Sequence, residues 1–217
     1  GLAFDRDADR LIAADEKGSI VDGYRIMALC ARDMAQRGIL KKNTLVATVM
    51  SNIGMVNTLR AEGIFVETTD VGDRYVLERM LSGGFNLGGE QSGHLIFLDK
   101  NTTGDGVLSA LELLSVMVRK DMPLSMLAHT IEIYPQILVN VAVPEEAKRA
   151  YAKDERILDR IRAAEEAFRR KGRVLVRTSG TEPLVRVMME GEDEKLVFSE
   201  AMAVAELIAQ TFGGRVK

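Results

Sequence analysis

The sequence predicts a layered α/β domain with a mixed, mostly parallel sheet, followed by a small α+β domain with an antiparallel sheet. Up to about residue 130, short apolar runs alternate with segments of helical periodicity, which is typical of layered α/β domains. After Tyr134-Pro135 the order becomes strand, helix, strand, strand, helix. A chain of 217 residues, 47% of them apolar, has room for two such domains.

The first part of the chain shows the alternation element by element. Residues 1–4 predict a strand, and residues 11–22 predict a hairpin, because a turn signal separates two short apolar runs. Asp22 is placed to cap a helix that ends near Gly38. The helix at 107–118 is apolar nearly all round and is therefore predicted to be buried. The remaining expected elements are strands at 45–49, 64–68, 86–89 and 94–97, and helices at 54–62 and 73–81.

The second part of the chain has another pattern. Residues 137–143 predict a strand that ends at Pro144, and apolar residues from Ile157 to Phe168 mark one face of a charged helix. This pattern is completed by two strands, at 173–177 and 184–190, and by a helix at 193–212. We expect the boundary to lie within 130–136. The expected domain segments are 1–21, 22–133 and 134–217.

Composition narrows the function classes. The net charge of −3 provides no bulk basic field for nucleic acid, and no apolar run approaches the ~20 residues that span a membrane. Cys30 is the only cysteine, so no intrachain disulfide forms, which fits a reducing compartment such as the cytoplasm. The chain has no initiator Met and opens directly into a polar loop. We therefore expect it to be the C-terminal part of a longer protein, whose N-terminal domains are its partners.

Asp5, Asp7 and Asp9 alternate with single residues directly after the first expected strand. Three closely spaced carboxylates repel one another unless a cation lies between them. Mg²⁺ prefers oxygen ligands and is often paired with phosphate, and Arg10 adds a planar cationic group suited to phosphate oxygens. The loop therefore predicts a metal site. The alternative is a solvated acidic turn.

A second loop, 88–94, reads Gly-Gly-Glu-Gln-Ser-Gly-His. Its glycines let the backbone approach a ligand closely. Glu90 and Ser92 offer donors and acceptors suited to sugar hydroxyls, and His94 is suited to proton transfer near neutral pH. A glycine-rich hairpin with a structural histidine remains the alternative.

A third loop lies between the two strands of the small domain. Arg177 and Arg186 flank a turn whose hydroxyls and glycine suit an anion. The favoured interpretation is a phosphate cradle, and the alternative is an ordinary polar turn. The turn residues considered are Ser179, Gly180 and Thr181.

Two strand-to-helix junctions are less specific. Gly72, Asp73 and Arg74 open the helix at 73–81, and a helix N-terminus with an arginine favours anions, although Asp73 as a simple helix cap explains it equally well. Residues 102–106, Thr-Thr-Gly-Asp-Gly, are explained by capping of the following helix. Taken together, the loops suit a phosphorylated sugar and phosphoryl transfer.

These loops, in this order, resemble those of the α-D-phosphohexomutase superfamily over nearly the whole chain. The stretches 71–76 and 89–94 look most like the branch that interconverts glucosamine 6-phosphate and glucosamine 1-phosphate. The resemblance implies four domains in the complete enzyme, of which this chain holds the end of the second, the third and the fourth. It also implies a phosphoserine in the absent first domain, which exchanges phosphoryl groups with the sugar through a bisphosphorylated intermediate.

The resemblance also implies residue roles. Asp5, Asp7 and Asp9 would hold Mg²⁺, and Arg10 would steady the phosphoserine. Glu90 and Ser92 would bind sugar hydroxyls, with His94 as proton shuttle. The residues expected to hold the non-reacting phosphate are Arg177, Ser179, Gly180, Thr181 and Arg186, and Gly72, Asp73 and Arg74 are further substrate-binding candidates.

One departure and three alternatives remain. The family usually has glycine where this chain has Arg6, and we expect Arg6 to point away from the carboxylates so that the metal site survives. The alternatives are a mutase of glucose or mannose phosphates, a hydrolase of the haloacid dehalogenase type, and a phosphosugar-binding module without turnover.

Overall fold

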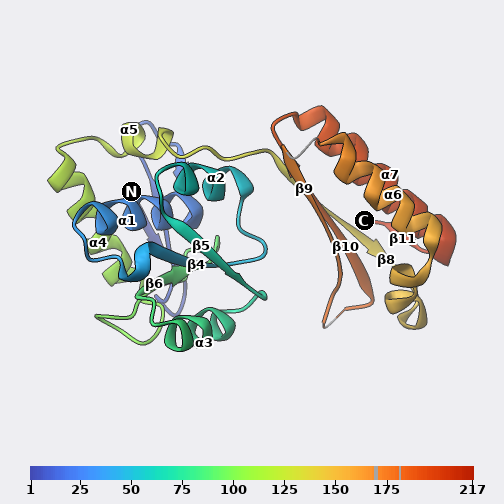
Figure 1. Cartoon of the computed structure of the whole chain (residues 1–217), viewed down its shortest axis with the longest axis horizontal. Helices are drawn as coiled ribbons and strands as arrows, with labels where there is room; N and C mark the ends of the chain where they lie inside the picture. The colour runs from blue at the N-terminus through green and yellow to red at the C-terminus, as the bar shows by residue number, and fades with distance from the viewer. Residues whose placement is uncertain (169–170, 181) are drawn as a thin grey trace. The chain divides into compact units, whose positions relative to one another are not determined.

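The chain divides into two units, Gly1–Ile133 and Tyr134–Lys217 (Figure 1). The computed structural model describes residues 1–168, 171–180 and 182–217. Each unit has its own apolar core, as expected for separately folded domains. The expected α/β architecture followed by an antiparallel α+β unit is confirmed.

The larger sheet of the first unit has the strand order β5-β4-β6-β7. The strand β4 (Thr44–Thr48) pairs in parallel with β5 (Phe65–Thr69) and with β6 (Leu87–Gly89), whereas β7 (Leu95–Phe97) runs antiparallel to β6. A short helix, η1 (Lys41–Asn43), precedes β4. The sheet is therefore mixed and mostly parallel.

Helices cover both faces of this sheet (Figure 1). Successive residues of a strand point to opposite faces, so Leu45 joins the apolar cluster of α1 (Gly23–Gln36) and α2 (Ile53–Ala61), while Val46 joins that of α3 (Asp73–Gly83). This alternation makes β4 a strand that is buried on both sides. The loops at its carboxyl edge are then the natural place for a ligand.

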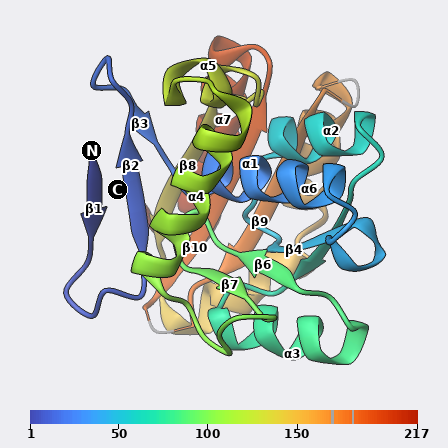
Figure 2. The same cartoon turned by 90° about the vertical axis from the view of Figure 1, so that its left-hand side faces the viewer.

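The first strands form a separate antiparallel sheet, β1-β2-β3, whose strands lie side by side in Figure 2. The expected hairpin is present as β2 (Leu11–Ala14) and β3 (Ile20–Val21), and β1 (Leu2–Phe4) pairs with β2. Residues 5–10, which include the three aspartates, therefore form the connection between β1 and β2.

The helix α4 (Gly106–Lys120) is not buried on all sides, so that expectation is wrong. Its inner face packs against α1 and contributes Ala110, Leu113 and Val116 to the core. The opposite apolar stripe has nothing packed over it within this unit, and Val118 is 80% exposed. The other exposed members of the stripe are Val107, Leu111 and Leu114. A second, unpredicted helix, α5 (Leu124–His129), follows.

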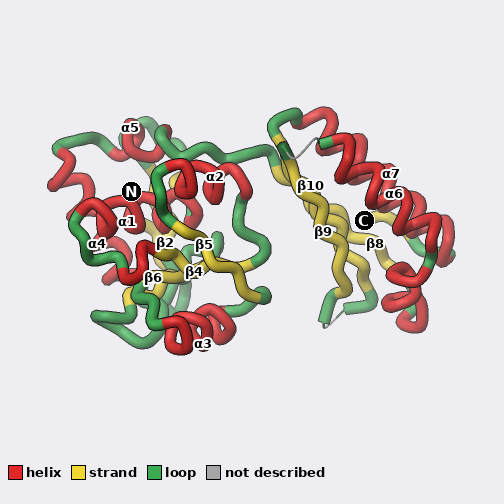
Figure 3. Tube along the Cα trace, in the orientation of Figure 1, coloured by secondary structure: helices red, strands yellow, loops and turns green. Residues whose placement is uncertain are grey.

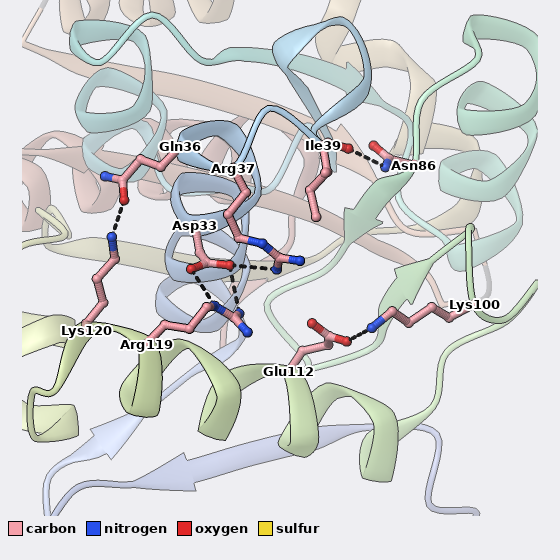
Figure 4. A network of polar contacts seen from close by, with 9 residues as sticks. All are labelled: Asp33, Gln36, Arg37, Ile39, Asn86, Lys100, Glu112, Arg119 and Lys120. Atoms are coloured by element: carbon pink, nitrogen blue, oxygen red, sulfur yellow. Dashed lines mark hydrogen bonds and ion pairs between the residues drawn. The ribbon is translucent and has the colours of Figure 1, made fainter.

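An ion-pair network ties α1 to α4 (Figure 4). Arg119 donates two hydrogen bonds to the buried carboxylate of Asp33, at 3.0 and 2.8 Å, and Arg37 donates a third at 3.2 Å. Burial raises the pKa of Asp33, but the hydrogen bonds from the two arginines outweigh burial and hold the pKa below its usual value. Cys30 lies on the same helix, and burial raises the pKa of its thiol, as expected for an inert cysteine.

Asp33→Asn is expected to lower the free energy of unfolding at pH 7 by about 1.5–3 kcal/mol, because it removes charge-assisted hydrogen bonds. The pKa of Asp33 is lowered in the folded state, so its stabilisation is present above the unfolded pKa and is lost as the pH falls through the folded pKa. Wild type and variant should therefore converge in acid. Urea unfolding between pH 7 and pH 3 measures this, with exposed Asp70→Asn as the control. A difference in the free energy of unfolding between wild type and Asp33→Asn that does not change with pH would contradict this prediction.

The second unit is a four-stranded antiparallel sheet of order β11-β8-β10-β9. Its central strands are β8 (Gln136–Ala142) and β10 (Leu184–Gly191), and its edges are β9 (Gly172–Thr178) and β11 (Arg215–Val216). The expected strands and their antiparallel pairing are confirmed. The short strand β11 was not predicted.

The helices of the second unit lie on one side of its sheet (Figure 3). They are η2 (Glu145–Lys153), α6 (Glu155–Ala167) and α7 (Glu194–Phe212). The strand residues that point toward them are mainly valines, such as Val141 and Val187. The opposite face carries Asn140, Arg177 and Arg186, and the helices described in this unit pack on the other side. In the described part of the chain, no helix is long and apolar enough to cross a membrane.

Candidate functional site

The acidic loop between β1 and β2 is a tight turn. Ala8 has a φ of +54°, and its N–H donates to the carbonyl of Asp5 at 3.2 Å. The side chain of Arg10 lies between two carboxylates, with its Nε 3.7 Å from Asp5 Oδ2 and 3.8 Å from Asp9 Oδ1. Arg6 is exposed, and that it points away from the carboxylates stays a prediction.

The chemistry of the loop fits a hard divalent cation, although its carboxylates do not converge. Carboxylate oxygens are the ligands that Mg²⁺ prefers. Asp9 Oδ1 is buried without a hydrogen-bond partner among the described residues, which fits an oxygen that faces a cation. Asp7 is exposed, and the described residues contain no group of three acidic, histidine or cysteine side chains gathered tightly enough to hold a metal. Binding would therefore require the carboxylates of the loop to draw closer together.

His94 lies between two acidic side chains. Its Nε2 is 3.7 Å from Asp9 Oδ2 and 3.9 Å from Asp73 Oδ2, and the imidazole side chain is only 5% exposed. Nδ1 is buried without a hydrogen-bond partner among the described residues. The backbone of His94 forms a β-bridge with Arg10. The structure thus brings the acidic loop, the glycine-rich loop and the start of α3 together around one imidazole.

The glycine-rich loop is fastened to β2 by a close backbone contact. The N–H of Leu11 donates to the carbonyl of Gly93 at 3.0 Å. Gly93 has a φ of +89°, and a Cβ atom there would lie 2.0 Å from the carbonyl oxygen of Leu11. Only glycine fits both requirements. The loop that carries Glu90, Ser92 and His94 is therefore held in register with the acidic loop.

Glu90 connects the glycine-rich loop to the start of α3. Its Oε1 accepts a hydrogen bond from the N–H of Gly72 at 3.1 Å. Gly72 itself is the N-cap of α3, with a φ of +135°, so Asp73 is not the cap; it is the first residue of the helix and points toward His94. Arg74 is exposed, and its Nε donates to Oε1 of Glu78 at 2.7 Å.

In the second unit, two arginines face each other on adjacent strands. Arg177 of β9 and Arg186 of β10 are direct cross-strand partners. Burial lowers the pKa of Arg177, and the charge of Arg186 lowers it further. Arg186 Nε is buried without a hydrogen-bond partner among the described residues. Like charges directly opposite destabilise a sheet, so this pair fits a site that receives an anion.

The turn between these strands is partly ordered by its own side chains. Ser179 is buried, its N–H donates to the carbonyl of Leu184 at 2.9 Å, and its Oγ accepts from the N–H of Glu182 at 3.2 Å. A Cβ atom on Gly180 would have no neighbour within 4 Å among the described residues beyond its two neighbours in the chain. Thr181 lies outside the described residues.

Sequence reasoning missed two polar neighbours of this arginine pair. Asn140 of β8 is the cross-strand partner of Arg186 on its other side, and its Oδ1 is buried without a partner among the described residues. Glu182 pairs with Arg186 at 3.0 Å. The signal for Asn140 was present, because it is the single polar residue within the apolar run 137–143.

Two family profiles account for most of the sequence. Residues 22–134, more than half of the chain, match the profile described as phosphoglucomutase/phosphomannomutase, alpha/beta/alpha domain III. Residues 138–207 match the phosphoglucomutase/phosphomannomutase C-terminal domain. The chain belongs to the phosphohexomutase family. The resemblance inferred from the loops is thereby confirmed.

The curated relatives of this phosphohexomutase chain share its sequence closely. It is 57% identical over 208 residues to the phosphoglucosamine mutase of Caldanaerobacter subterraneus, which covers 96% of this chain and 46% of the relative. It is 54% identical over 217 residues to that of Citrifermentans bemidjiense, covering 100% and 47%. The chain thus spans about half the length of the curated relatives it matches.

Solved structures show the same fold. An Aspergillus fumigatus N-acetylphosphoglucosamine mutase superimposes with a TM-score of 0.81 at 22% identity, covering 97% of this phosphohexomutase chain and 48% of the other. A second structure from that organism, in complex with GlcNAc-6P and magnesium, gives a TM-score of 0.79 at 23% identity, with coverages of 97% and 48%.

Proposed function

We propose that this chain forms the metal-, sugar- and phosphate-binding part of a phosphoglucosamine mutase, which interconverts glucosamine 6-phosphate and glucosamine 1-phosphate. The observation that carries the proposal is the pair of facing arginines, Arg177 and Arg186, on the face of the second unit's sheet opposite its helices. Two adjacent guanidinium groups with an unused buried N–H suit a phosphate dianion. The names of the relatives at 52–57% identity support glucosamine as the sugar.

The proposed reaction divides the work among the loops. Arg177 and Arg186, with Ser179, Gly180 and Thr181, hold the phosphate that does not react. Glu90 and Ser92 bind sugar hydroxyls, and Gly72, Asp73 and Arg74 border the sugar loop. Arg74 would have to leave Glu78 to contact the substrate.

At the reacting end, a phosphoserine of another domain exchanges its phosphoryl group with the sugar, and a bisphosphorylated sugar is the intermediate. Arg10 steadies the phosphoserine, and His94 accepts or returns the proton of the reacting hydroxyl at Nε2. Asp5, Asp7 and Asp9 would hold Mg²⁺. When bound, the ion supplies charge neutralisation for the transferring phosphoryl group.

The sugar specificity is tested with a full-length mutase that carries this sequence. We expect turnover of glucosamine 6-phosphate to exceed that of glucose 6-phosphate and mannose 6-phosphate, each measured with its bisphosphate primer. Preference for either neutral hexose would replace this proposal with the phosphoglucomutase/phosphomannomutase alternative. The magnesium requirement, the binding of phosphosugar and a location in the cytoplasm belong to the same proposal.

The Arg186→Ala variant is expected to weaken the binding of glucosamine 6-phosphate about ten- to a hundredfold, because a charge-assisted hydrogen bond to phosphate is worth roughly 1.5–3 kcal/mol. Calorimetric titration of the full-length protein measures this. Arg156→Ala, which removes an exposed arginine on α6, is the matched control and should bind normally. Glucosamine without phosphate should not distinguish Arg186→Ala from wild type. Equal affinities for the phosphosugar would leave the loop as an ordinary turn.

A second candidate for the chain on its own is phosphosugar binding without turnover. It is favoured by the coverage of 46–47% of the curated relatives, because the nucleophilic phosphoserine is assigned by the family resemblance to another domain. A mutase assay on the purified chain separates the two. Turnover would exclude the binding-only candidate.

A further inference from the structure

Two glycines flank the residue that caps α4. Asp105 is the N-cap, and its carboxylate accepts a hydrogen bond from the N–H of Leu108 at 2.9 Å. Gly104 and Gly106 stand on either side of it, and neither has a φ in the left-handed region. Backbone conformation therefore does not require glycine at either position. Capping accounts for Asp105 but for neither glycine.

The space at Gly104 is filled by the imidazole of His94. A Cβ atom on residue 104 would lie 2.3 Å from Nε2 and 2.4 Å from Cδ2 of the ring. Real Cβ atoms do not approach other atoms so closely, so the ring or the backbone would have to move. Nε2 is the atom that lies between Asp9 and Asp73, at 3.7 and 3.9 Å. The backbone of Gly104, which carries no side chain, therefore packs directly against the imidazole ring of His94.

The space at Gly106 is filled by the acidic loop. A Cβ atom there would lie 2.4 Å from the carbonyl oxygen of Arg10 and 2.9 Å from that of Ala8. The N–H of Gly106 donates to the carbonyl of Ala8 at 2.9 Å. Ala8 is the left-handed residue of the turn, with a φ of +54°. Gly106, the first residue of α4, therefore packs directly against the turn that carries the carboxylates.

We propose that Gly104 and Gly106 are positioning residues, which set the His94 ring and the Asp5–Arg10 turn against one rigid element, the start of α4. The importance of both for the reaction rests on the proposed function, because it depends on the roles given there to His94 and the acidic loop. The contacts of Gly104 and Gly106 with the ring and the turn do not depend on the proposed function. The segment 104–106 therefore acts through His94 and through the backbone of residues 8–10, without touching the substrate.

A double-mutant cycle tests the half that concerns Gly104. Gly104→Ala, His94→Ala and the double variant of the chain are compared with wild type by urea unfolding. If the ring fills the space, Gly104→Ala should lower the unfolding midpoint markedly in the presence of His94 and little in its absence. Thr103→Ala, on the exposed neighbouring residue, should show no such coupling. If Gly104→Ala alone does not fold, folding of the double variant of Gly104→Ala with His94→Ala would also show that the ring fills this space. Equal losses in both backgrounds would overturn the proposal.

A spectroscopic measurement separates positioning from general destabilisation. The chain has two histidines, so the exposed His129 serves as an internal reference for His94 in the ¹H–¹³C spectrum of the imidazoles at fixed pH. Gly104→Ala should shift the His94 signals and leave those of His129 in place. Gly106→Ala should shift the backbone amide signals of residues 8–10. Unshifted signals in these folded variants would overturn the corresponding half of the proposal, whatever the outcome of the mutase assays.

Discussion

Asp9→Asn in a full-length mutase that carries this sequence is expected to reduce turnover by about a hundredfold or more. The substitution keeps the shape of the side chain and removes its charge. One oxygen of Asp9 lies 3.7 Å from His94 Nε2, and the other is buried near Arg10 without a hydrogen-bond partner among the described residues. The variant would weaken the cation site and also leave the imidazole without its nearest anion. Loss of metal-based charge stabilisation alone is worth several kcal/mol.

The measurement is the initial rate as a function of Mg²⁺ concentration. Asp9→Asn should require more Mg²⁺ and should stay below wild type at saturation, because the effect on His94 does not depend on the ion. Asp121→Asn, at the exposed C-terminal end of α4, removes a carboxylate elsewhere and should behave as wild type. Near-normal turnover of Asp9→Asn at limiting Mg²⁺ would remove this residue from the site.

Gly93→Ala is expected to destabilise the first unit by roughly 3 kcal/mol or more. Two costs add. Alanine is strained at a φ of +89°, and its Cβ would lie 2.0 Å from the carbonyl oxygen of Leu11. Relieving that overlap would break the hydrogen bond from Leu11 N–H to the carbonyl of Gly93, which is 3.0 Å long. The glycine-rich loop would then lose its backbone contact with β2.

The hairpin glycine Gly18 provides a matched control. Its φ of +84° is close to that of Gly93, and no atom lies within 4 Å of the Cβ that an alanine would add. Gly18→Ala therefore reports the conformational strain alone, about 1–2 kcal/mol. The difference between the two variants in urea unfolding measures the overlap with Leu11. Equal losses would mean that the loop adapts, and that it is not held in register by this contact.

Much of the fold was predictable because local signals agreed with the tertiary structure. Asp22 caps α1, as its position before the periodic residues indicates. The buried strand β4 and the charged helix α6 follow from apolar runs and periodicity. The exposed stripe of α4 was not predictable, because a helix that is apolar all round gives no indication of which face has a neighbour. The short strand β11 was missed because two residues carry no periodicity.

The candidate site was predictable in its residues more than in its contacts. The sequence identified Arg177 and Arg186, but only the pairing of β9 with β10 shows that they face each other. It identified His94 and Asp9 on separate loops, but their approach depends on the backbone contact at Gly93 and on the bare backbone of Gly104. Such close approaches between segments far apart in sequence leave no local pattern beyond the glycine itself.

The facing arginines also restrict how the hairpin of the second unit can vary in length. Side chains alternate between the two faces of a strand, so slipping one strand by a single residue moves its whole set to the other face. A one-residue insertion that shifted β10 would carry Arg186 toward the side where Val141 and Val187 meet the helices, and would bring a valine to the face opposite the helices. Insertions or deletions between Arg177 and Arg186 should therefore be rare among homologues, even where the turn residues themselves change.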